Sequence, residues 1–192
     1  MSRIENLKKL HEHHNNICVC KLKETAIQPV FGDGNPDSRI VFIGEAPGKK
    51  EDQTGVPFIG AAGKFLAEML ALIGMKREDI YITNIVKYRP PDNRDPEPDE
   101  KRQCADWLRA ELELIKPKLI VFLGRHSMNH FFPDLKISDA HGKLIQTKLH
   151  DFPTTNFLPL YHPAAALYNG GLRNELLKDF KKIPRILKKI KK

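Results

Sequence analysis

The chain has 192 residues, 41% of them hydrophobic and 29% charged, a balance typical of a globular protein with one buried core. Its longest purely apolar runs, such as residues 119–123, are far too short to cross a bilayer, and its first residues lack the apolar segment of a secretory signal. Three cysteines give no even disulfide framework, so we expect a cytoplasmic protein with no membrane partner.

The net charge of +8 is distributed unevenly along the chain. Residues 178–192 contain eight Lys or Arg residues and one Asp, which leaves the rest of the chain close to neutral. A basic segment of this kind suits a polyanion such as nucleic acid. A solvated helix with a basic face accounts for the same residues equally well, so the charge alone does not decide between them.

The first predicted helix begins at Ser2, because Glu5 three residues later completes a capping-box pattern and apolar residues continue at helical spacing. Its end is rich in possible metal ligands: His11, His13, His14, Cys18 and Cys20.

The apolar run at residues 39–43 predicts a short buried strand, which ends in the loop Gly44-Glu45-Ala46-Pro47-Gly48. Small residues in such a loop allow a ligand to approach the backbone. Later elements follow from periodicity and from Gly and Pro positions: helix 65–73, strand 80–86, proline-rich loop 89–98, helix 104–115, strand 119–123, short helix 128–132, a possible hairpin within 125–156, strand 157–161, and a last helix over about 172–192 kinked at Pro184.

Nearly continuous apolar strands that alternate with helices predict an α/β fold with a mainly parallel sheet covered on both faces. No internal repeat or linker divides the sequence, so we predict a single domain over residues 1–192 with a basic C-terminal helix.

Polar groups follow three of the predicted strands: the loop at 44–48, Thr83-Asn84 and His162-Pro163. The carboxyl ends of parallel strands share one edge of a sheet, where open α/β proteins bind their ligands. A flexible loop, an amide, an imidazole and the aromatic ring of Phe58 together indicate a site for a small, flat, polar heterocycle. Each residue alone is more often structural, and only their joint placement favours a site.

Several segments together carry a family resemblance: Gly44-Glu45-Ala46-Pro47-Gly48 with Glu51 and Asp52, the glycine-rich 55–63, Tyr81-Ile82-Thr83-Asn84 with Val86-Lys87, Arg89-Pro90-Pro91, and His162-Pro163-Ala164-Ala165. In this order they resemble family 4 of the uracil-DNA glycosylases, whose known members usually carry an iron–sulfur cluster. The match runs through about residues 17–183. The resemblance implies a three-layer αβα sandwich around a four-stranded, mainly parallel sheet.

The resemblance also implies an activity, hydrolysis of the N-glycosidic bond of uracil in DNA by a monofunctional glycosylase that starts base-excision repair. By motif position, Phe58 would stack on the extruded uracil, Asn84 would read its Watson–Crick edge, and His162 would donate a hydrogen bond to O2. The backbone of Gly44, Ala46 and Gly48 would hold the base and an adjacent water. Glu45 and Glu51 would lie in the pocket as further catalytic candidates, with Glu51 limiting larger bases.

The expected partner is uracil-containing DNA, single- or double-stranded, bound by a monomer. Candidate phosphate contacts are Lys87, Arg89, Arg94 and Arg173. Ala165, Leu167 and Tyr168 stand where the family has its wedge, but the usual large apolar residue and Leu-Arg pair are replaced. A weak wedge favours uracil in single strands or mismatches, where less unstacking is needed. His141 occupies a position where a basic residue often contacts DNA.

The resemblance implies four cysteine ligands for a [4Fe–4S] cluster, and this chain departs from that pattern. Cys20 and Cys104 fit two positions, Ile17 and Tyr88 occupy the others, and Cys18 is one residue out of register. Neither Ile nor Tyr is a normal cluster ligand, so we expect that the cluster is lost and that no metal or cofactor is bound. A different metal held by Cys18, Cys20 and the nearby histidines is the alternative.

Two other functions compete with this interpretation. A uracil-DNA binding protein without turnover is one, but relatives of that kind use a histidine in the loop that corresponds to residues 89–98, which contain none. A nucleotide or phosphate enzyme is the other, and the loop at 44–48 lacks both the dinucleotide-binding and the Walker spacing of glycines.

Overall fold

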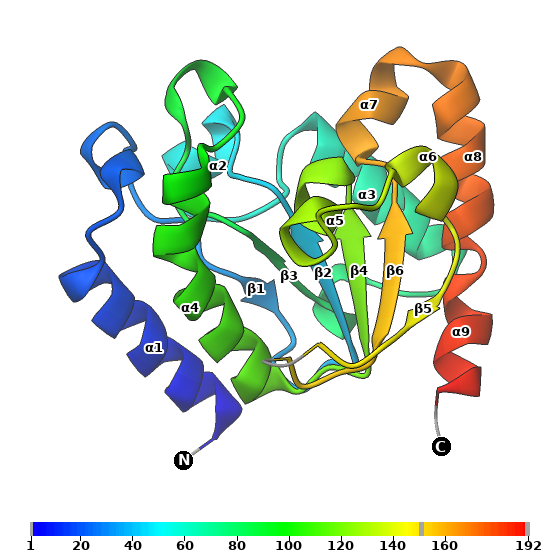
Figure 1. Ribbon diagram of the computed structural model, residues 1–192, viewed down its shortest axis with the longest axis horizontal. Coiled ribbons are helices and arrows are strands. Elements are labelled where there is room, and N and C mark those ends of the chain that lie inside the picture. Colours follow the sequence, from blue (N-terminus) through cyan, green and yellow to red (C-terminus); the bar gives the residue numbers. More distant parts are fainter. Residues whose placement is uncertain (1, 150–151, 191–192) are drawn as a thin grey trace.

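The computed structural model describes residues 2–149 and 152–190 of the chain (Figure 1). Its helices are α1 Arg3–Ile17, α2 Lys49–Thr54, α3 Ala61–Leu72, α4 Pro98–Ile115, α5 Arg125–Phe131, α6 Ile137–Ala140, α7 Pro163–Tyr168, α8 Gly170–Phe180 and α9 Ile183–Lys189, with 3-10 turns at Lys21–Glu24, Arg77–Asp79 and Pro91–Asn93. Its strands are β1 Asp33–Gly34, β2 Ile40–Gly44, β3 Tyr81–Asn84, β4 Leu119–Leu123, β5 Ile145–Gln146 and β6 Asn156–Leu160.

One sheet with the strand order β1-β3-β2-β4-β6-β5 forms the centre of the molecule. The inner strands β3, β2, β4 and β6 run parallel, and the two-residue strands β1 and β5 pair antiparallel at the edges. The predicted four-stranded parallel sheet is therefore present, with a short antiparallel strand added at each edge. The sequence gives little sign of β1 and β5, because two residues cannot show strand periodicity.

Successive residues of the central strands supply two separate cores. Val41, Ile43 and Phe122 face one core together with residues of α1 and α4. Ile40 and Phe42 face the other, which is completed by residues of α3, α8 and α9. Because strand side chains alternate between faces, this pattern produces the three helix–sheet–helix layers seen in Figure 1, as predicted.

The C-terminal part differs from its prediction. Instead of one kinked helix, α8 ends at Phe180 and α9 begins at Ile183, with Pro184 near its start, where the missing backbone donor costs nothing. Lys191 and Lys192 of the basic segment lie outside the described residues. Within the described part, no helix combines the length and apolar character that a membrane span requires.

The chain leaves β2 for β3 on one side and reaches β4 on the other, so the strand order reverses at the carboxyl end of β2. Such a switch point separates the loops that follow neighbouring strands and creates a crevice. The carboxyl ends of β4 and β6 point to the top of Figure 1, the side on which α2 and α7 lie.

Candidate active site

A cavity of about 370 Å³ lies at the carboxyl ends of the central strands. Segments distant in sequence contribute its lining: Glu45, Ala46, Pro47, Gly48, Glu51, Phe58, Ala62, Asn84, Pro90, Asn93, Arg94, His162 and Ala164. The sequence-predicted binding and catalytic residues therefore all line one space, except Gly44, which is not among the lining residues. Its volume is within the range of small-molecule sites.

Gly44 ends β2 directly beneath this cavity. A Cβ atom at this position would overlap Asn84 Oδ1 and would lie 2.6 Å from Phe58 Cζ. Only glycine lets these two side chains approach the strand end so closely. This close approach explains why the motif begins with a glycine.

Phe58 has an unusual backbone, with φ of 54°, in the left-handed region that aromatic residues rarely occupy. Arg77 holds this conformation by donating to the carbonyl oxygens of Pro57 (2.5 Å) and Phe58 (3.2 Å). The ring is 8% exposed, and its centroid lies 5.8 Å from that of His162. Local strain of this kind is typical of functional sites, and here it presents an aromatic face to the cavity.

Asn84 brings a buried amide to the cavity. Its Oδ1 atom is buried and accepts no hydrogen bond from residues 2–149 and 152–190. A buried acceptor without a partner carries a free-energy cost of about 1–3 kcal/mol. That cost is removed when a ligand donates an N–H group to this oxygen.

His162 caps the start of α7, where its Nδ1 accepts a hydrogen bond from the backbone N–H of Ala164 at 3.1 Å. Burial, and to a lesser extent the nearby His126, lower its pKa to about 4. The ring is therefore neutral at physiological pH, and the accepted bond at Nδ1 places its proton on Nε2. The side chain is a neutral hydrogen-bond donor beside the cavity.

Glu45 lies against His126 of α5. His126 Nδ1 is 3.4 Å from Glu45 Oε1, and its Nε2 is 3.2 Å from Asp95 Oδ2. Burial and the negative charge of Asp95 raise the pKa of Glu45 to about 7. Although these three side chains form a possible metal-ligand group, the two histidine nitrogens face different carboxylates. Glu45 Oε1 has no hydrogen-bond partner among the described residues, and His126 Nε2 accepts a hydrogen bond from Arg125 Nε at 3.0 Å.

Glu51 lines the cavity from α2 and also shapes its wall. Its Oε1 atom accepts hydrogen bonds from the backbone N–H groups of Ile59 (2.9 Å) and Gly60 (2.8 Å). These bonds fix the loop that carries Phe58, a contribution that the motif pattern did not reveal.

The predicted phosphate contact at Lys87 is wrong. Its side chain is 1% exposed and forms an ion pair with Glu111, so it does not reach the surface where DNA would lie. Arg94 also holds a carboxylate, that of Glu100, at 2.6 Å. Arg89 is partly exposed and donates to Asn93, and Arg173 pairs with Glu68 over the ring of Phe65.

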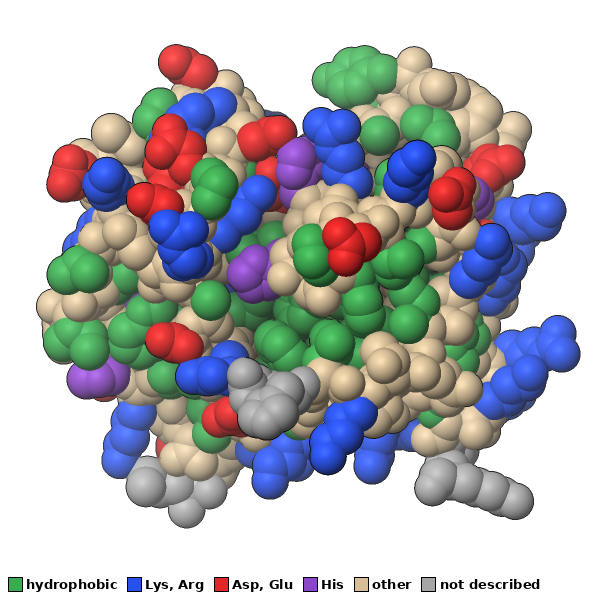
Figure 2. All heavy atoms as spheres, viewed as in Figure 1, with side chains coloured by type: hydrophobic (Ala, Val, Ile, Leu, Met, Phe, Trp, Pro, Cys, Tyr) green, Lys and Arg blue, Asp and Glu red, His purple; other side chains and the backbone are tan. Residues whose placement is uncertain are grey.

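The candidate wedge residues lie on α7 beside the cavity. Ala165 is exposed, Leu167 is 38% exposed and Tyr168 is 92% exposed. His141, the other proposed DNA contact, is held by Asp179, with 2.6 Å between Nδ1 and Oδ2. Exposed Lys and Arg side chains lie on α8, on α9 and between them: Lys178, Lys181, Arg185, Lys188 and Lys189. Basic side chains are visible along the right-hand edge in Figure 2.

The cysteine region does not fit a [4Fe–4S] cluster. Cys18, Cys20 and Cys104 are buried free thiols, and the sulfur atoms of Cys20 and Cys104 are 3.9 Å apart. Tyr88, which occupies the third of the four expected ligand positions, is 1% exposed and stacks on His14. At the first position Ile17 is 53% exposed. A cubane needs four thiolate-type ligands, and here a buried aromatic ring fills the place of one of them.

Several residues at the site were missed by sequence reasoning: Arg77 behind Phe58, His126 and Asp95 beside Glu45, and Glu111 beside Lys87. All act through contacts between segments far apart in the chain. No local pattern marks such residues, so the sequence offered no signal for them.

Comparison with known proteins identifies the family of the chain. Residues 31–188 match the model of the uracil DNA glycosylase superfamily. A type-4 uracil-DNA glycosylase of Sulfurisphaera tokodaii is 44% identical over 94% of this chain and 84% of its own length. Those of Archaeoglobus fulgidus and Thermotoga maritima are 49% and 38% identical, over 85% and 98% of this chain and 84% and 98% of their own lengths. The chain therefore belongs to the uracil-DNA glycosylase superfamily, in its type-4 branch.

Proposed function

We propose that the cavity binds a uracil base everted from DNA and that the protein hydrolyses its N-glycosidic bond, leaving an abasic site for base-excision repair. The observation that carries this proposal is the unpaired, buried Oδ1 of Asn84 in a cavity that also contains Phe58 and His162. Uracil has an N3–H donor for this oxygen. Cytosine has an acceptor at N3 and is refused.

The physical steps follow from these side chains. A base inside a duplex must first be flipped out, at a cost of a few kcal/mol. Stacking on Phe58 returns about 1–3 kcal/mol of this cost. Exposed Leu167 and Tyr168 at the end of α7 are positioned to fill the space that the base leaves, and the basic α8–α9 edge attracts the phosphate backbone.

Bond cleavage places negative charge on the uracil and positive charge on the sugar. The neutral His162, with its proton on Nε2, donates to O2 of the departing base, where the negative charge develops. Because this charge is larger in the transition state than in the bound substrate, the hydrogen bond accelerates the reaction. In its ionised form, Glu45 orients the water that attacks the sugar.

We propose that these steps require no [4Fe–4S] cluster in this chain, since Tyr88 and Ile17 replace two ligands and the buried ring of Tyr88 packs within the region. The three buried free thiols suit a reducing compartment, consistent with a repair enzyme that works inside the cell. We propose that it acts as a monomer.

The direct test is incubation with an end-labelled uracil-containing oligonucleotide, followed by alkali, which cleaves the strand at abasic sites. Strand scission at uracil and none at cytosine is the expected result. Asn84→Asp is expected to lose activity or to lose the distinction between the two bases. Tight binding to the uracil strand without scission would instead indicate a binding protein without turnover.

A further inference from the structure

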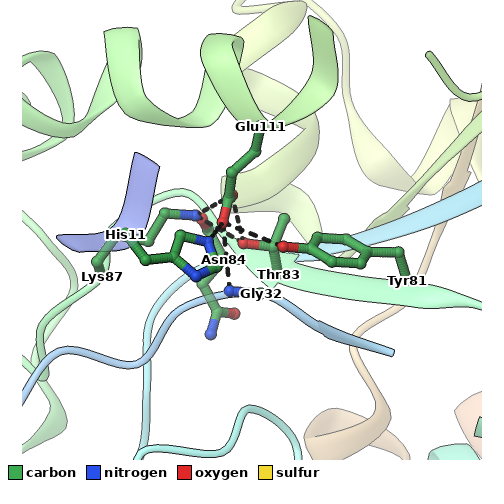
Figure 3. A network of polar contacts seen from close by, with 7 residues as sticks. All are labelled: His11, Gly32, Tyr81, Thr83, Asn84, Lys87 and Glu111. Carbon is green, nitrogen blue, oxygen red and sulfur yellow. Dashed lines mark hydrogen bonds and ion pairs between the residues drawn. The ribbon is translucent and has the colours of Figure 1, made fainter. Parts of the chain in front are cut away.

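A buried ion pair lies beside Asn84, at the end of β3. The Lys87 ammonium is 2.5 Å from Glu111 Oε2, and both side chains are 1% exposed (Figure 3). Lys87 follows β3 closely in the chain, whereas Glu111 comes from α4, so the pair joins the recognition strand to a covering helix.

The ammonium group also holds the end of β3. Lys87 Nζ donates to Thr83 Oγ1 at 2.6 Å and to the backbone carbonyl oxygen of Asn84 at 3.0 Å. With Glu111, these bonds use all three of its donors. The hydroxyl of Thr83 in turn donates to Glu111 Oε2 at 2.9 Å. Both residues that end the strand are therefore fixed by one charged network.

The second carboxylate oxygen of Glu111 ties the network to other parts of the fold. Oε1 accepts hydrogen bonds from His11 Nε2 of α1 (3.1 Å), the Gly32 N–H (3.3 Å) and the Tyr81 hydroxyl (3.3 Å). Burial alone would raise the pKa of Glu111, but Lys87 and His11 hold it below its usual value. The carboxylate is thus a fixed anchor with contacts to α1, β3 and the chain before β1.

Stability alone does not explain such a pair. Replacing a buried ion pair by apolar residues of similar volume is often neutral or stabilising, because desolvation of two charges offsets their attraction. This pair is buried at the end of the strand that carries the Asn84 amide. Its position indicates that the pair fixes the geometry of that strand end. Asn84 also needs such support, since its own Oδ1 has no partner within the described residues to hold the side chain in place.

We propose that Lys87 and Glu111 are positioning residues for uracil recognition. They fix the backbone of Asn84, so that its amide faces the Watson–Crick edge of the everted base before the base arrives. This inference rests on the proposed function and adds to it, because neither residue touches the substrate. It also gives Lys87, a residue of the motif, a role in place of the rejected phosphate contact.

The test compares variants that separate positioning from stability. The double variant Lys87→Met/Glu111→Leu removes both charges without leaving one unpaired, but it also takes the acceptor from the buried Thr83 and Tyr81 hydroxyls. We therefore expect a lower melting temperature, and activity is compared well below it. Because the Asn84 carbonyl then loses the Lys87 donor, we expect kcat/KM on uracil oligonucleotides to fall by about 10²-fold, the scale expected for a 1 Å misplacement. We also expect the inhibition constant for free uracil to rise.

The matched control is Leu112→Ala on the same helix. Leu112 is fully buried next to Glu111, but its apolar side chain takes no part in the hydrogen bonds of the network, so its truncation destabilises α4 through lost packing. Below its melting temperature this variant is expected to keep the parental kcat/KM and the parental inhibition constant. A double variant with parental uracil affinity, or a Leu112→Ala variant that loses as much, would overturn the proposal.

A readout that needs no activity separates this proposal from the proposed function. We expect the side-chain amide of Asn84 to give one sharp pair of NMR signals in the parent and broadened or doubled signals in the double variant. Identical sharp signals in both would refute the positioning role. A parent that cleaves no uracil strand would refute the proposed function, while the NMR comparison would still decide the role of the network.

Discussion

Phe58 and His162, which follow β2 and β6 respectively, face the same cavity with ring centroids 5.8 Å apart. The planes of the two rings differ by 36°. We predict that a flat base stacked on Phe58 presents its edge to His162. Phe58 offers a stacking face, and His162 offers a hydrogen-bond donor at a defined angle to it.

We predict that His162→Ala lowers kcat by about 10²–10³-fold, the usual effect of removing one preorganised donor to a developing anion. Burial lowers the pKa of His162 to about 4, so the neutral donor is fully present above about pH 5. The ratio of parental to variant kcat should thus be constant from weakly acidic to weakly alkaline pH. Single-turnover kinetics on a uracil oligonucleotide measure it, and equal rates would refute the assigned role.

Glu45 should make the parental rate depend on pH near neutrality. Burial and Asp95 raise its pKa to about 7, with smaller opposing effects from Lys101 and Arg125. Since the ionised form orients the water, we predict that kcat rises with pH through about 7. Asp95→Asn removes a negative charge and should shift this profile to lower pH. The pH profiles of both proteins provide the test, and a flat parental profile would contradict it.

His14 should make the fold sensitive to acid. Burial, followed by the charge of Lys87, lowers its pKa from 6.5 to about 4. Between these values the unfolded chain binds a proton that the folded chain does not, so stability falls as the pH decreases, by up to about 1.4 kcal/mol per pH unit. We predict that His14→Phe, which can pack against Phe31 and Trp107, loses less stability on acidification.

Thermal unfolding at neutral and at mildly acidic pH measures this effect. The exposed neighbour His13 provides a control, since His13→Gln should keep the parental acid sensitivity. The same loss of stability in the parent and in His14→Phe would show that His14 does not contribute.

Iron content tests the expected loss of the cluster. With Tyr88 buried at one ligand position and Ile17 at another, we predict far less than one iron per chain after anaerobic purification. Glycosylase activity should also be insensitive to chelators. Iron and sulfide analysis measures this directly, and four irons with matching sulfide would contradict the prediction.

The sequence was sufficient for those parts of the fold and site that depend on local patterns. The apolar strands, their order with the helices and the polar residues at strand ends all follow from periodicity and turn chemistry. Asn84 and His162 could be placed on one edge because parallel strands end together. The comparisons confirm the family, whereas the individual roles of the site residues stay predictions.

Features that depend on long-range contacts could not be predicted. Lys87 looked like a surface cation because its partner, Glu111, comes from another helix. The left-handed backbone of Phe58 depends on Arg77 and gives no signal in the residues around it. The break between α8 and α9 was also missed, since a proline predicts either a kink or a new helix start and packing decides between them.

The most direct measurement is a crystal structure of the protein with free uracil. We predict that the base stacks on Phe58, that Asn84 Oδ1 accepts from its N3–H group, and that His162 Nε2 donates to O2. Uracil bound elsewhere, or bound in this cavity without contact to Asn84 and His162, would contradict the central claim that this cavity reads an everted base.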